Sequence, residues 1–163
     1  MKALIKSFGY AFCGIFSTIR TERNMRIHLV VSLYMYGYLL CYDFFEVSRT
    51  QFAILFLANA IVMMGEIVNT AVEAVVDLVE KRRNELCKIA KDAAAGAVLV
   101  GAIFAVLVGI AILWQPEAFR RMFTYYRENP WMLAVLAASL AVSVLFIFKT
   151  GKKSGIGKES AHD

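Results

Sequence analysis

The sequence predicts an all-α membrane protein, and three observations support this: an apolar composition, helical periodicity and a one-sided distribution of basic residues. Hydrophobic residues make up 60% of the 163 residues, and the chain contains only two prolines. Soluble domains have about 45–50% apolar residues, so this chain is expected to lie largely in lipid. Three cysteines, Cys13, Cys41 and Cys87, have no C-x-x-C spacing and no histidine cluster, so neither a zinc site nor a disulfide framework is indicated.

The expected elements are one surface helix followed by four membrane spans. In residues 1–20, apolar side chains recur at intervals of three and four opposite a polar face, which is typical of an amphipathic helix on the membrane surface. Hydrophobic runs near the length that a bilayer requires then predict the spans. They cover about 27–42, 49–80, 91–114 and 130–148. Residues 115–129 are expected to form a loop, and the Lys-, Gly- and Ser-rich tail 149–163 is expected to be disordered.

The basic residues predict the orientation of these spans. With the N-terminus inside, the segments up to Arg26, from Glu80 to Asp92, and after Phe148 carry 14 of the 18 Lys and Arg residues. The positive-inside rule therefore places both termini, and the connection after the second span, in the cytosol. The net charge of +5 sits in short blocks beside apolar spans rather than along one stripe, so no nucleic-acid partner is expected.

The segment from Glu66 to Asp77 places three carboxylates inside one of the most apolar stretches of the chain. On a helix, Glu66, Glu73 and Asp77 fall within about 40° of one another. Asn69 and Thr70 flank them on the same side. An ionisable group costs about 2.5–3.5 kcal/mol at the centre of a bilayer, so this acidic face must meet partners, water or cations. A divalent metal ion would relieve the repulsion.

Carboxylates with a nearby lysine and an amide are suited to metal-assisted phosphoryl transfer. Mg²⁺ prefers oxygen ligands and commonly joins one or two carboxylates to nucleotide phosphates. Glu73 fits this role together with Glu22, which lies in the polar elbow between the surface helix and the first span. Lys91 offers a compact cation for phosphate charge. Glu66, expected where lipid meets water, is placed to accept a hydroxyl proton.

These residues lie in segments that resemble the prokaryotic diacylglycerol kinase and undecaprenol kinase family of small integral membrane lipid kinases. The matching segments are Arg20-Thr-Glu-Arg-Asn24, Arg26-Ile-His28, Gly65 to Asp77 and Ala90 to Val98. The likeness covers about residues 1–114, in order and with the family's three-helix spacing. We therefore expect residues 1–114 to form a membrane lipid kinase domain, to which the span 130–148 is an addition.

The resemblance also implies roles for individual residues. It implies that Glu66 is the general base and that Glu22 and Glu73 hold the magnesium ion of the MgATP co-substrate. Asn69 and Asp77 are implied to support the same nucleotide site. Further nucleotide contacts are implied for Tyr10, Arg82, Arg83, Asn84, Lys91 and Asp92. Trimers with sites shared between subunits, a bacterial inner-membrane location and an active site facing the cytosol are implied as well.

The implied reaction is transfer of the γ-phosphoryl group of MgATP to a lipid alcohol. The elbow Arg-Thr-Glu-Arg-Asn and the later Lys-Asp-Ala-Ala-Ala-Gly resemble the undecaprenol kinases, whereas the diacylglycerol enzymes usually carry a serine near Ala95. Undecaprenol is therefore expected ahead of diacylglycerol. The alternative function is a non-enzymatic oligomer, an ion pathway or small transporter lined by the acidic face. Simpler interpretations also stay open for Tyr10 as an interfacial aromatic and for His28 as a polar residue at the membrane boundary.

Overall fold

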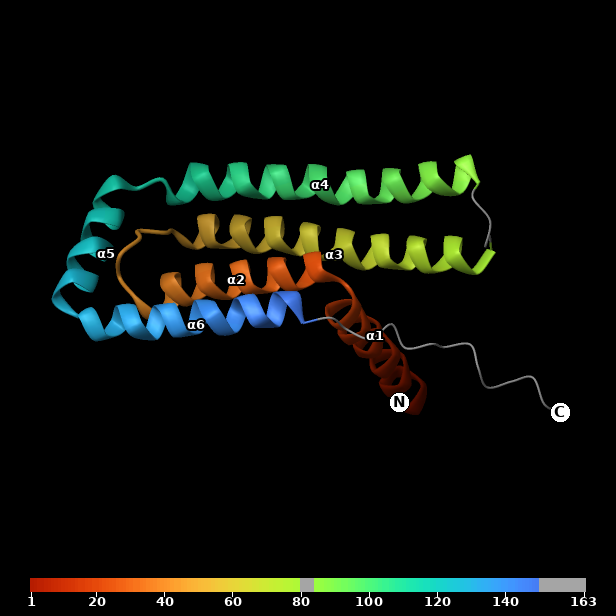
Figure 1. Ribbon diagram of the computed structural model, residues 1–163, viewed down its shortest axis with the longest axis horizontal. Helices are drawn as coiled ribbons and strands as arrows, with labels where there is room; N and C mark the ends of the chain where they lie inside the picture. Colours follow the sequence, from red (N-terminus) through yellow and green to blue (C-terminus); the bar gives the residue numbers. More distant parts are fainter. Residues whose placement is uncertain (80–83, 150–163) are drawn as a thin grey trace.

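The computed structural model describes residues 1–79 and 84–149, and within these ranges the chain forms helices and no strand (Figure 1). The helices are α1 (Lys2–Thr21), α2 (Arg23–Cys41), α3 (Arg49–Val79), α4 (Glu85–Leu113), α5 (Pro116–Glu128) and α6 (Pro130–Phe148). The predicted all-α class is therefore confirmed. The predictions for Arg82, Arg83 and most of the tail, from residue 150 on, fall outside the described residues.

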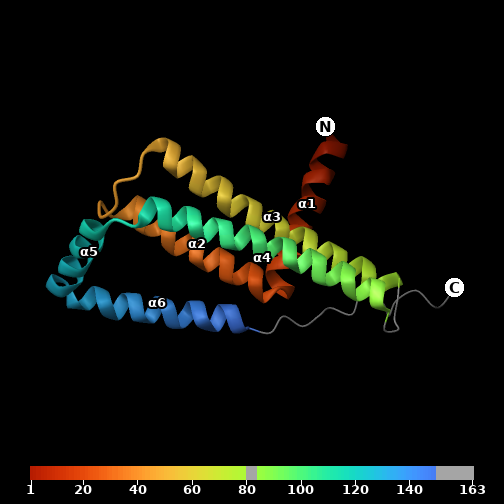
Figure 2. The same cartoon turned by 90° about the horizontal axis from the view of Figure 1, so that it is seen from above.

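The helices form a row that is crossed at one end by α5 (Figure 1). The most extensive contact joins α3 to α4, which run antiparallel, while α2 packs against both α3 and α6. From the start of α2, α1 leaves the row at an angle (Figure 2). The α1–α2 junction and the far ends of α3 and α4 thus share one half of the molecule, and α5 lies at the other end.

Glu22 forms the sharp junction between α1 and α2. Its backbone is extended, with φ −97° and ψ 120°, so it ends α1 and precedes the first residue of α2. Its amide still donates to the carbonyl oxygen of Thr18 over 2.8 Å, which satisfies one polar group at the end of α1. The predicted polar elbow is therefore a single extended residue between two helices.

Small residues let α3 and α4 approach closely. A methyl group added at Gly65 would lie 3.4 Å from Cγ2 of Val98, already in contact, and one added at Gly101 would lie 3.8 Å from Ile61. Larger side chains at these two positions would push the helices apart. Glycine at helix–helix contacts is a common means of close packing in membranes, and here it brings α4 against the segment of α3 that carries Glu66.

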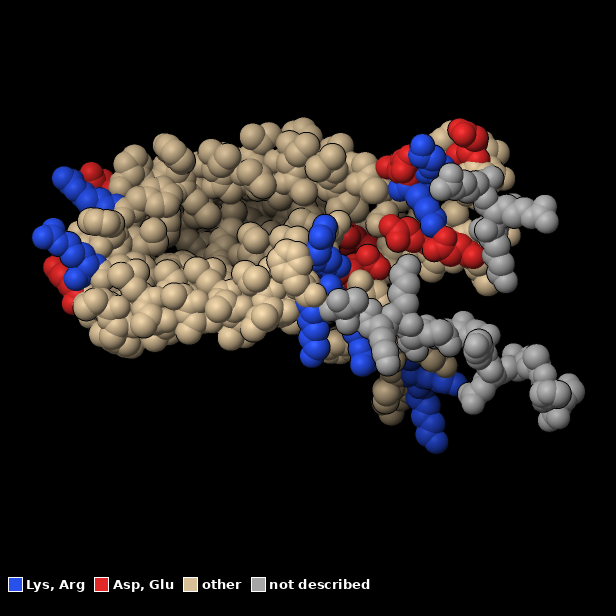
Figure 3. Space-filling view, in the orientation of Figure 1, with Lys and Arg blue, Asp and Glu red and all other residues tan. Residues whose placement is uncertain are grey.

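In the part of the chain that the structure describes, three helices, α3, α4 and α6, are long and apolar enough to cross a membrane by length and composition. They correspond to three of the four predicted spans. The fourth, α2, lies beside α3 but is less apolar, because its first turns carry arginines, Asn24 and His28 and its middle carries three tyrosines. On the face shown in Figure 3, charged side chains gather toward the two ends and the region between them is apolar, as a membrane protein requires.

The prediction of a loop over 115–129 is wrong, because α5 occupies most of it. Pro116 stands in the first turn of α5, where its missing N–H costs nothing. One side of the helix then packs aromatic rings on the end of the bundle: Phe119 meets Phe45 at 5.6 Å, and Tyr125 meets Phe44 at 5.5 Å, between ring centroids. The charged residues on its other side made the segment resemble a polar loop in the sequence.

Two helix starts also differ from prediction. The third predicted span begins at Glu85 in α4 rather than near Lys91, because Asn84 caps the helix and its Oδ1 accepts a hydrogen bond from the amide of Leu86 over 2.9 Å. Likewise α2 begins at Arg23, not near Ile27, since only the extended Glu22 separates it from α1. Both helices therefore extend their polar ends beyond the apolar stretch.

Candidate functional site

A cavity of about 270 Å³ lies between α2, α3 and α4, and Glu66 forms part of its wall. The polar part of the lining consists of Asn24, His28, Glu66 and Asn69. The apolar part consists of Ile27 from α2 and of Ala95, Val98, Leu99 and Ala102 from α4. The site therefore has one polar side, built by α2 and α3, and one side of small and branched apolar residues from α4.

Glu66 is the most deeply buried charged side chain in this cavity, at 2% exposed. Its Oε1 is 3.6 Å from His28 Nε2 on α2. The side chain of Asn24 and the carboxylates of Glu22 and Glu73 are also close enough to interact with it electrostatically. Four groups from the elbow, α2 and α3 thus surround the Glu66 carboxylate. The sequence pattern had shown only which side of the helix this carboxylate occupies.

Asn69 connects this carboxylate to the next acidic residue on α3. It is 7% exposed, and its Nδ2 donates a hydrogen bond to Glu73 Oε1 over 3.0 Å. Its Oδ1 is buried and has no hydrogen-bond partner among the described residues. A buried amide oxygen without a partner costs about 1–3 kcal/mol, so this oxygen is suited to a ligand that it can reach.

The oxygen atoms of Glu22, Glu73 and Asn69 match the ligand chemistry of Mg²⁺. Within residues 1–79 and 84–149, no three His, Cys, Asp or Glu side chains form a cluster that could hold a metal ion. Mg²⁺ does not require such a cluster, since it usually keeps several waters and binds one or two carboxylates together with phosphates. The residues present therefore fit a magnesium ion that arrives with a nucleotide.

Asp77 and Lys91 form an ion pair between α3 and α4, in which Lys91 Nζ donates to Asp77 Oδ1. Both side chains are partly exposed, at 57% and 35% respectively. The pair lies toward the end of the α3–α4 hairpin, beyond the buried Glu66. It holds the Lys91 ammonium group on the acidic side of α3.

The structure brings together some predicted site residues and not others. Glu22, Glu66, Asn69 and Glu73 interact with one another, and Asp77 holds Lys91. Asp92 is exposed on α4. Tyr10 is 65% exposed on α1, with Lys6 Nζ 5.9 Å from its ring centroid, and does not line the cavity. Asn84 acts as the cap of α4.

Sequence reasoning missed the role of His28, which lines this cavity, and that of the buried Arg26. Arg26 is 5% exposed, and its guanidinium donates to three carbonyl oxygens. The acceptors are Ile19 at 3.1 Å, Arg20 at 3.0 Å and Ile147 at 3.0 Å. His28 follows Asn24 by four residues, a spacing that places both side chains on one face of a helix. That spacing is the signal that could have directed His28 toward the site.

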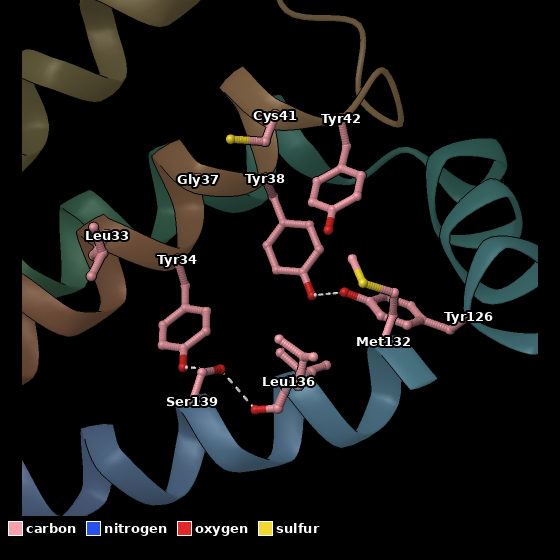
Figure 4. Close-up of a pocket in the computed structure, with 11 residues that line it drawn as sticks. Leu33, Tyr34, Gly37, Tyr38, Cys41, Tyr42, Tyr126, Met132, Leu136 and Ser139 are labelled. Atoms are coloured by element: carbon pink, nitrogen blue, oxygen red, sulfur yellow. Dashed lines mark hydrogen bonds between the residues drawn. The ribbon is translucent and has the colours of Figure 1, made fainter. Parts of the chain in front are cut away.

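A second cavity, of about 370 Å³, lies between α2 and the α5–α6 segment (Figure 4). Tyr34 donates to Ser139 Oγ over 2.8 Å, and the hydroxyl groups of Tyr38 and Tyr126 lie 2.6 Å apart. Burial and the hydrogen bond to Tyr38 raise the pKa of Tyr126 to about 12. These contacts fasten α6 and the end of α5 to α2, on the side of α2 away from α4.

Comparison with known protein families matches residues 9–113 to the family described as prokaryotic diacylglycerol kinase. A diacylglycerol kinase of Synechocystis is 42% identical over 114 residues, which cover 69% of this chain and 63% of that protein. An undecaprenol kinase of Bacillus subtilis is 38% identical over 112 residues, 69% of this chain and 89% of the relative. A diacylglycerol kinase of Escherichia coli is 32% identical with the same coverage. Helices α5 and α6 lie beyond the residues that the family model matches.

Proposed function

The chain belongs to the prokaryotic diacylglycerol kinase family, and we propose that it is a membrane-embedded lipid kinase that transfers the γ-phosphoryl group of MgATP to the hydroxyl group of a lipid alcohol. The observation that carries this proposal is the buried Glu66, which faces a cavity that is polar on one side and apolar on the other. Such a cavity can accept the hydroxyl end of a lipid and present it to a base.

In this proposal Glu66 is the general base. A base must lie within hydrogen-bond reach of the proton that it removes, and a lipid hydroxyl group in the cavity would meet the Glu66 carboxylate at its wall. Asn24 and Asn69 are the amides that line the same cavity and can orient that hydroxyl group. Closing the site with lipid also excludes water, which would otherwise compete as an acceptor of the phosphoryl group.

Glu22 and Glu73 are the proposed ligands of the magnesium ion, with Asn69 Oδ1 as a further oxygen in reach of the site. When bound, Mg²⁺ would offset the phosphate charge and orient the γ-phosphoryl group. Asn69 holds Glu73 in place through its Nδ2, so that the carboxylate keeps one orientation. A metal-binding side chain that is already held in place loses less conformational entropy on binding than one that must first become ordered.

The nucleotide contacts form the outer part of the proposal. Asp77 fixes the Lys91 ammonium group, which would offset negative charge on the phosphates as the phosphoryl group moves. Further proposed nucleotide contacts, implied by the family resemblance, are Tyr10, Arg82, Arg83, Asn84 and Asp92. The exposed Asp92 stands next to Lys91 in the first half of α4, on the polar end of that helix.

The α4 wall of the cavity favours undecaprenol over diacylglycerol as the acceptor. Diacylglycerol carries ester carbonyls close to its hydroxyl group, and buried carbonyls require hydrogen-bond donors. The side chains that α4 presents to the cavity, from Ala95 to Ala102, offer no donor. A polyprenol has an apolar chain directly behind its hydroxyl group, so it matches a wall of this kind. Diacylglycerol is the second choice.

Location and assembly complete the proposal. We place the protein in the bacterial inner membrane with the active site facing the cytosol, because 14 of the 18 Lys and Arg residues lie at or beyond that end of the predicted spans. We further propose a homotrimer in which a neighbouring copy completes the nucleotide site, as the family resemblance implies. The exposed apolar faces of α3 and α4 support contact with other helices or with lipid.

An ion pathway lined by the acidic face is less well supported. Glu66 is paired with His28, Asp77 with Lys91, and Glu73 with Asn69. A continuous row of acidic groups facing water is what such a pathway would need, and these pairings on α3 do not leave one. Ion flux through vesicles that carry the protein, without any need for a nucleotide, would support this alternative instead.

The test is to incubate the purified protein with γ-labelled ATP, Mg²⁺ and, in separate mixed micelles, undecaprenol, diacylglycerol or ceramide. Label is expected in the undecaprenol fraction first and to a lesser extent in diacylglycerol. Omitting Mg²⁺ is expected to abolish the transfer. Labelling of none of these lipids, with the protein folded, would refute a lipid kinase. Labelling of diacylglycerol alone would refute the proposed acceptor but keep the activity.

A further inference from the structure

His28 lies against Glu66 but has no part in the reaction proposed above. Its Nε2 is 3.6 Å from Glu66 Oε1, and both side chains line the same cavity. The Glu66 side chain is 2% exposed, whereas the His28 side chain is 26% exposed. The imidazole ring therefore forms a link between a buried carboxylate and a more accessible region of the site.

The other charged groups that face this pair are acidic. Glu22 from the elbow and Glu73 from the same helix act electrostatically on the Glu66 carboxylate. The side chains that α4 contributes to the cavity, from Ala95 to Ala102, carry no titratable group. A carboxylate surrounded in this way has one neighbour that can accept a proton and become a cation, and that neighbour is His28.

Two other cations, Lys91 of α4 and Arg26 of α2, are engaged elsewhere. Lys91 donates to Asp77, nearer the end of the α3–α4 hairpin. The guanidinium group of Arg26 donates hydrogen bonds to three backbone carbonyl oxygens. An arginine side chain also stays protonated in proteins, so it cannot accept a proton. Within the part of the chain that the structure describes, His28 is the basic side chain that lies against the Glu66 carboxylate.

A buried base has to release the proton that it removes. In each turnover the lipid O–H bond breaks, a bond forms between that oxygen and the γ-phosphorus, and the bond from phosphorus to ADP breaks. The proton ends on Glu66. Until this carboxyl group loses the proton it cannot serve as a base again, and its 2% exposure leaves little direct contact with water.

We propose that His28 positions Glu66 and also accepts the proton that Glu66 removes from the lipid, an inference that rests on the proposed function. The proton passes from the Glu66 carboxyl group to Nε2 of neutral His28, which leaves a carboxylate beside an imidazolium cation. The imidazolium then releases the proton to water, and both side chains return to their starting forms. Histidine is suited to this step because its charge changes near neutral pH.

The distance fits a contact that tightens during turnover. At 3.6 Å the two atoms lie beyond hydrogen-bond distance, so a protonated Glu66 carboxyl group does not yet donate its O–H to Nε2. Catalytic hydrogen bonds are often long before substrate binds. A shift of about 0.5 Å, well within side-chain motion, would bring Nε2 into hydrogen-bond range.

Two substitutions test the inference in the full-length protein. His28→Gln keeps a hydrogen-bond donor but cannot carry the proton, so kcat for lipid phosphorylation is expected to fall about 100-fold, the lower end of the range for general acid–base groups. The KM for ATP is expected to stay unchanged, because His28 does not belong to the nucleotide contacts. In His28→Ala, added imidazole is expected to restore part of the lost turnover by accepting the proton in place of the ring.

The pH profile separates proton transfer from a structural role. Wild-type kcat is expected to fall on the acid side as His28 becomes protonated, because protonated His28 cannot accept a proton. In His28→Gln this histidine-dependent fall is expected to disappear. A packing defect would lower kcat at every pH without changing the shape of the profile.

Ser32→Ala is the matched control. Ser32 lies one turn further along α2 and is 8% exposed, and its Oγ has no hydrogen-bond partner among the described residues. Removing this hydroxyl group is therefore expected to leave kcat near the wild-type value. Wild-type kcat and pH profile in His28→Gln, or no effect of imidazole on His28→Ala, would overturn the inference while the lipid kinase proposal stands. If the wild-type protein labels no lipid, the proposed function fails and this inference fails with it.

Discussion

At the scale of single residues, Asn69 determines how the acidic side of α3 is used. Its Nδ2 donates to Glu73 while its Oδ1 stays buried without a partner among the described residues. The amide therefore holds one carboxylate in place and presents an oxygen to the same region. Glu66, one turn earlier, faces the cavity and His28 instead. The two carboxylates thus have different surroundings and can serve as base and metal ligand respectively.

Glu73→Gln tests the assignment of the metal ligand. Removing the negative charge is expected to raise the Mg²⁺ concentration for half-maximal activity by about 10- to 100-fold, the range seen when groups that support a metal site are replaced. A titration of lipid phosphorylation against Mg²⁺ at saturating ATP measures this. Glu46→Gln serves as the control, because Glu46 is 84% exposed and pairs with Arg121 of α5 at the other end. Equal Mg²⁺ requirements in both variants would contradict the assignment.

Asp77→Asn tests the role of the ion pair with Lys91. The lysine is expected to lose its fixed position, so the KM for ATP should rise by a few-fold while kcat changes less. Stability should hardly change, since both side chains are partly exposed and an exposed pair contributes little. Initial rates at varied ATP measure the effect. The double variant Asp77→Asn with Lys91→Met completes the test. If its change in KM equals the combined changes of the two single variants, the pair does not act as a unit.

At the scale of the helices, Arg26 joins three elements. Its hydrogen bonds reach the last carbonyls of α1 and the end of α6, and the C-terminal ends of helices attract positive charge. The elbow with Glu22 and Asn24 lies directly before it in the chain. Arg26 therefore fixes the direction in which α1 leaves the bundle and holds α6 beside the elbow.

Arg26→Lys is expected to lower the free energy of unfolding by about 2–3 kcal/mol, because hydrogen bonds to charged groups contribute about 1.5–3 kcal/mol each and lysine cannot reproduce the planar fork. Unfolding in detergent micelles, followed by circular dichroism, measures this. Arg23→Lys on the first turn of α2 is the matched control, since Arg23 is exposed. Equal stability of the two variants would show that the buried guanidinium does not hold the helices together.

The contact between α5 and α2 has a pH dependence with a definite sign. The pKa of Tyr126 is raised to about 12 by burial and by its hydrogen bond to Tyr38, above the ordinary value of 10.0. The folded state therefore keeps this proton more tightly than the unfolded state. Its contribution to stability is complete below pH 10 and is lost as the pH rises toward 12.

Tyr126→Phe removes both the hydrogen bond and this titration. Below pH 10 the variant is expected to be less stable by about 1 kcal/mol, the usual contribution of one hydrogen bond. Between pH 10 and 12 its stability should decline less steeply than that of the wild type. Unfolding curves across this range measure both effects, and Tyr10→Phe on the exposed face of α1 is the control. Parallel curves for Tyr126→Phe and wild type would contradict the assigned contact.

The elements differ in how far the sequence could predict them. The helical spacing of Glu66, Glu73 and Asp77 was sufficient to place them on one side of α3, because that pattern is local. The contact of His28 with Glu66, and of Arg26 with Ile147, joins residues from different helices. Such contacts depend on how the helices align, and the spacing of residues along a single helix does not show that alignment. The sequence analysis expected a loop in place of α5 because the segment carries many charged residues. Its aromatic residues form one side of a helix that packs on the end of the bundle, and these contacts are visible only in the structure.

At the scale of the whole molecule, a family core carries an added helical segment. The family model matches residues 9–113, which include the cavity and its polar groups. Beyond it, α5 turns the chain and α6 returns beside α2, where Tyr34 bonds to Ser139 (Figures 1 and 4). The added helix covers the side of α2 that faces away from α4. It therefore leaves the opening between α2, α3 and α4 to the proposed lipid acceptor.

The most direct test of this account compares wild type and Glu66→Gln for transfer of label from γ-labelled ATP to undecaprenol at saturating Mg²⁺. The buried amide keeps the size of the side chain, so the variant is expected to fold and to bind ATP. Its kcat should fall by about 10²- to 10⁴-fold, the range for a general base. A Glu66→Gln protein that phosphorylates undecaprenol at close to the wild-type rate would contradict the central claim that Glu66 removes the proton of the lipid.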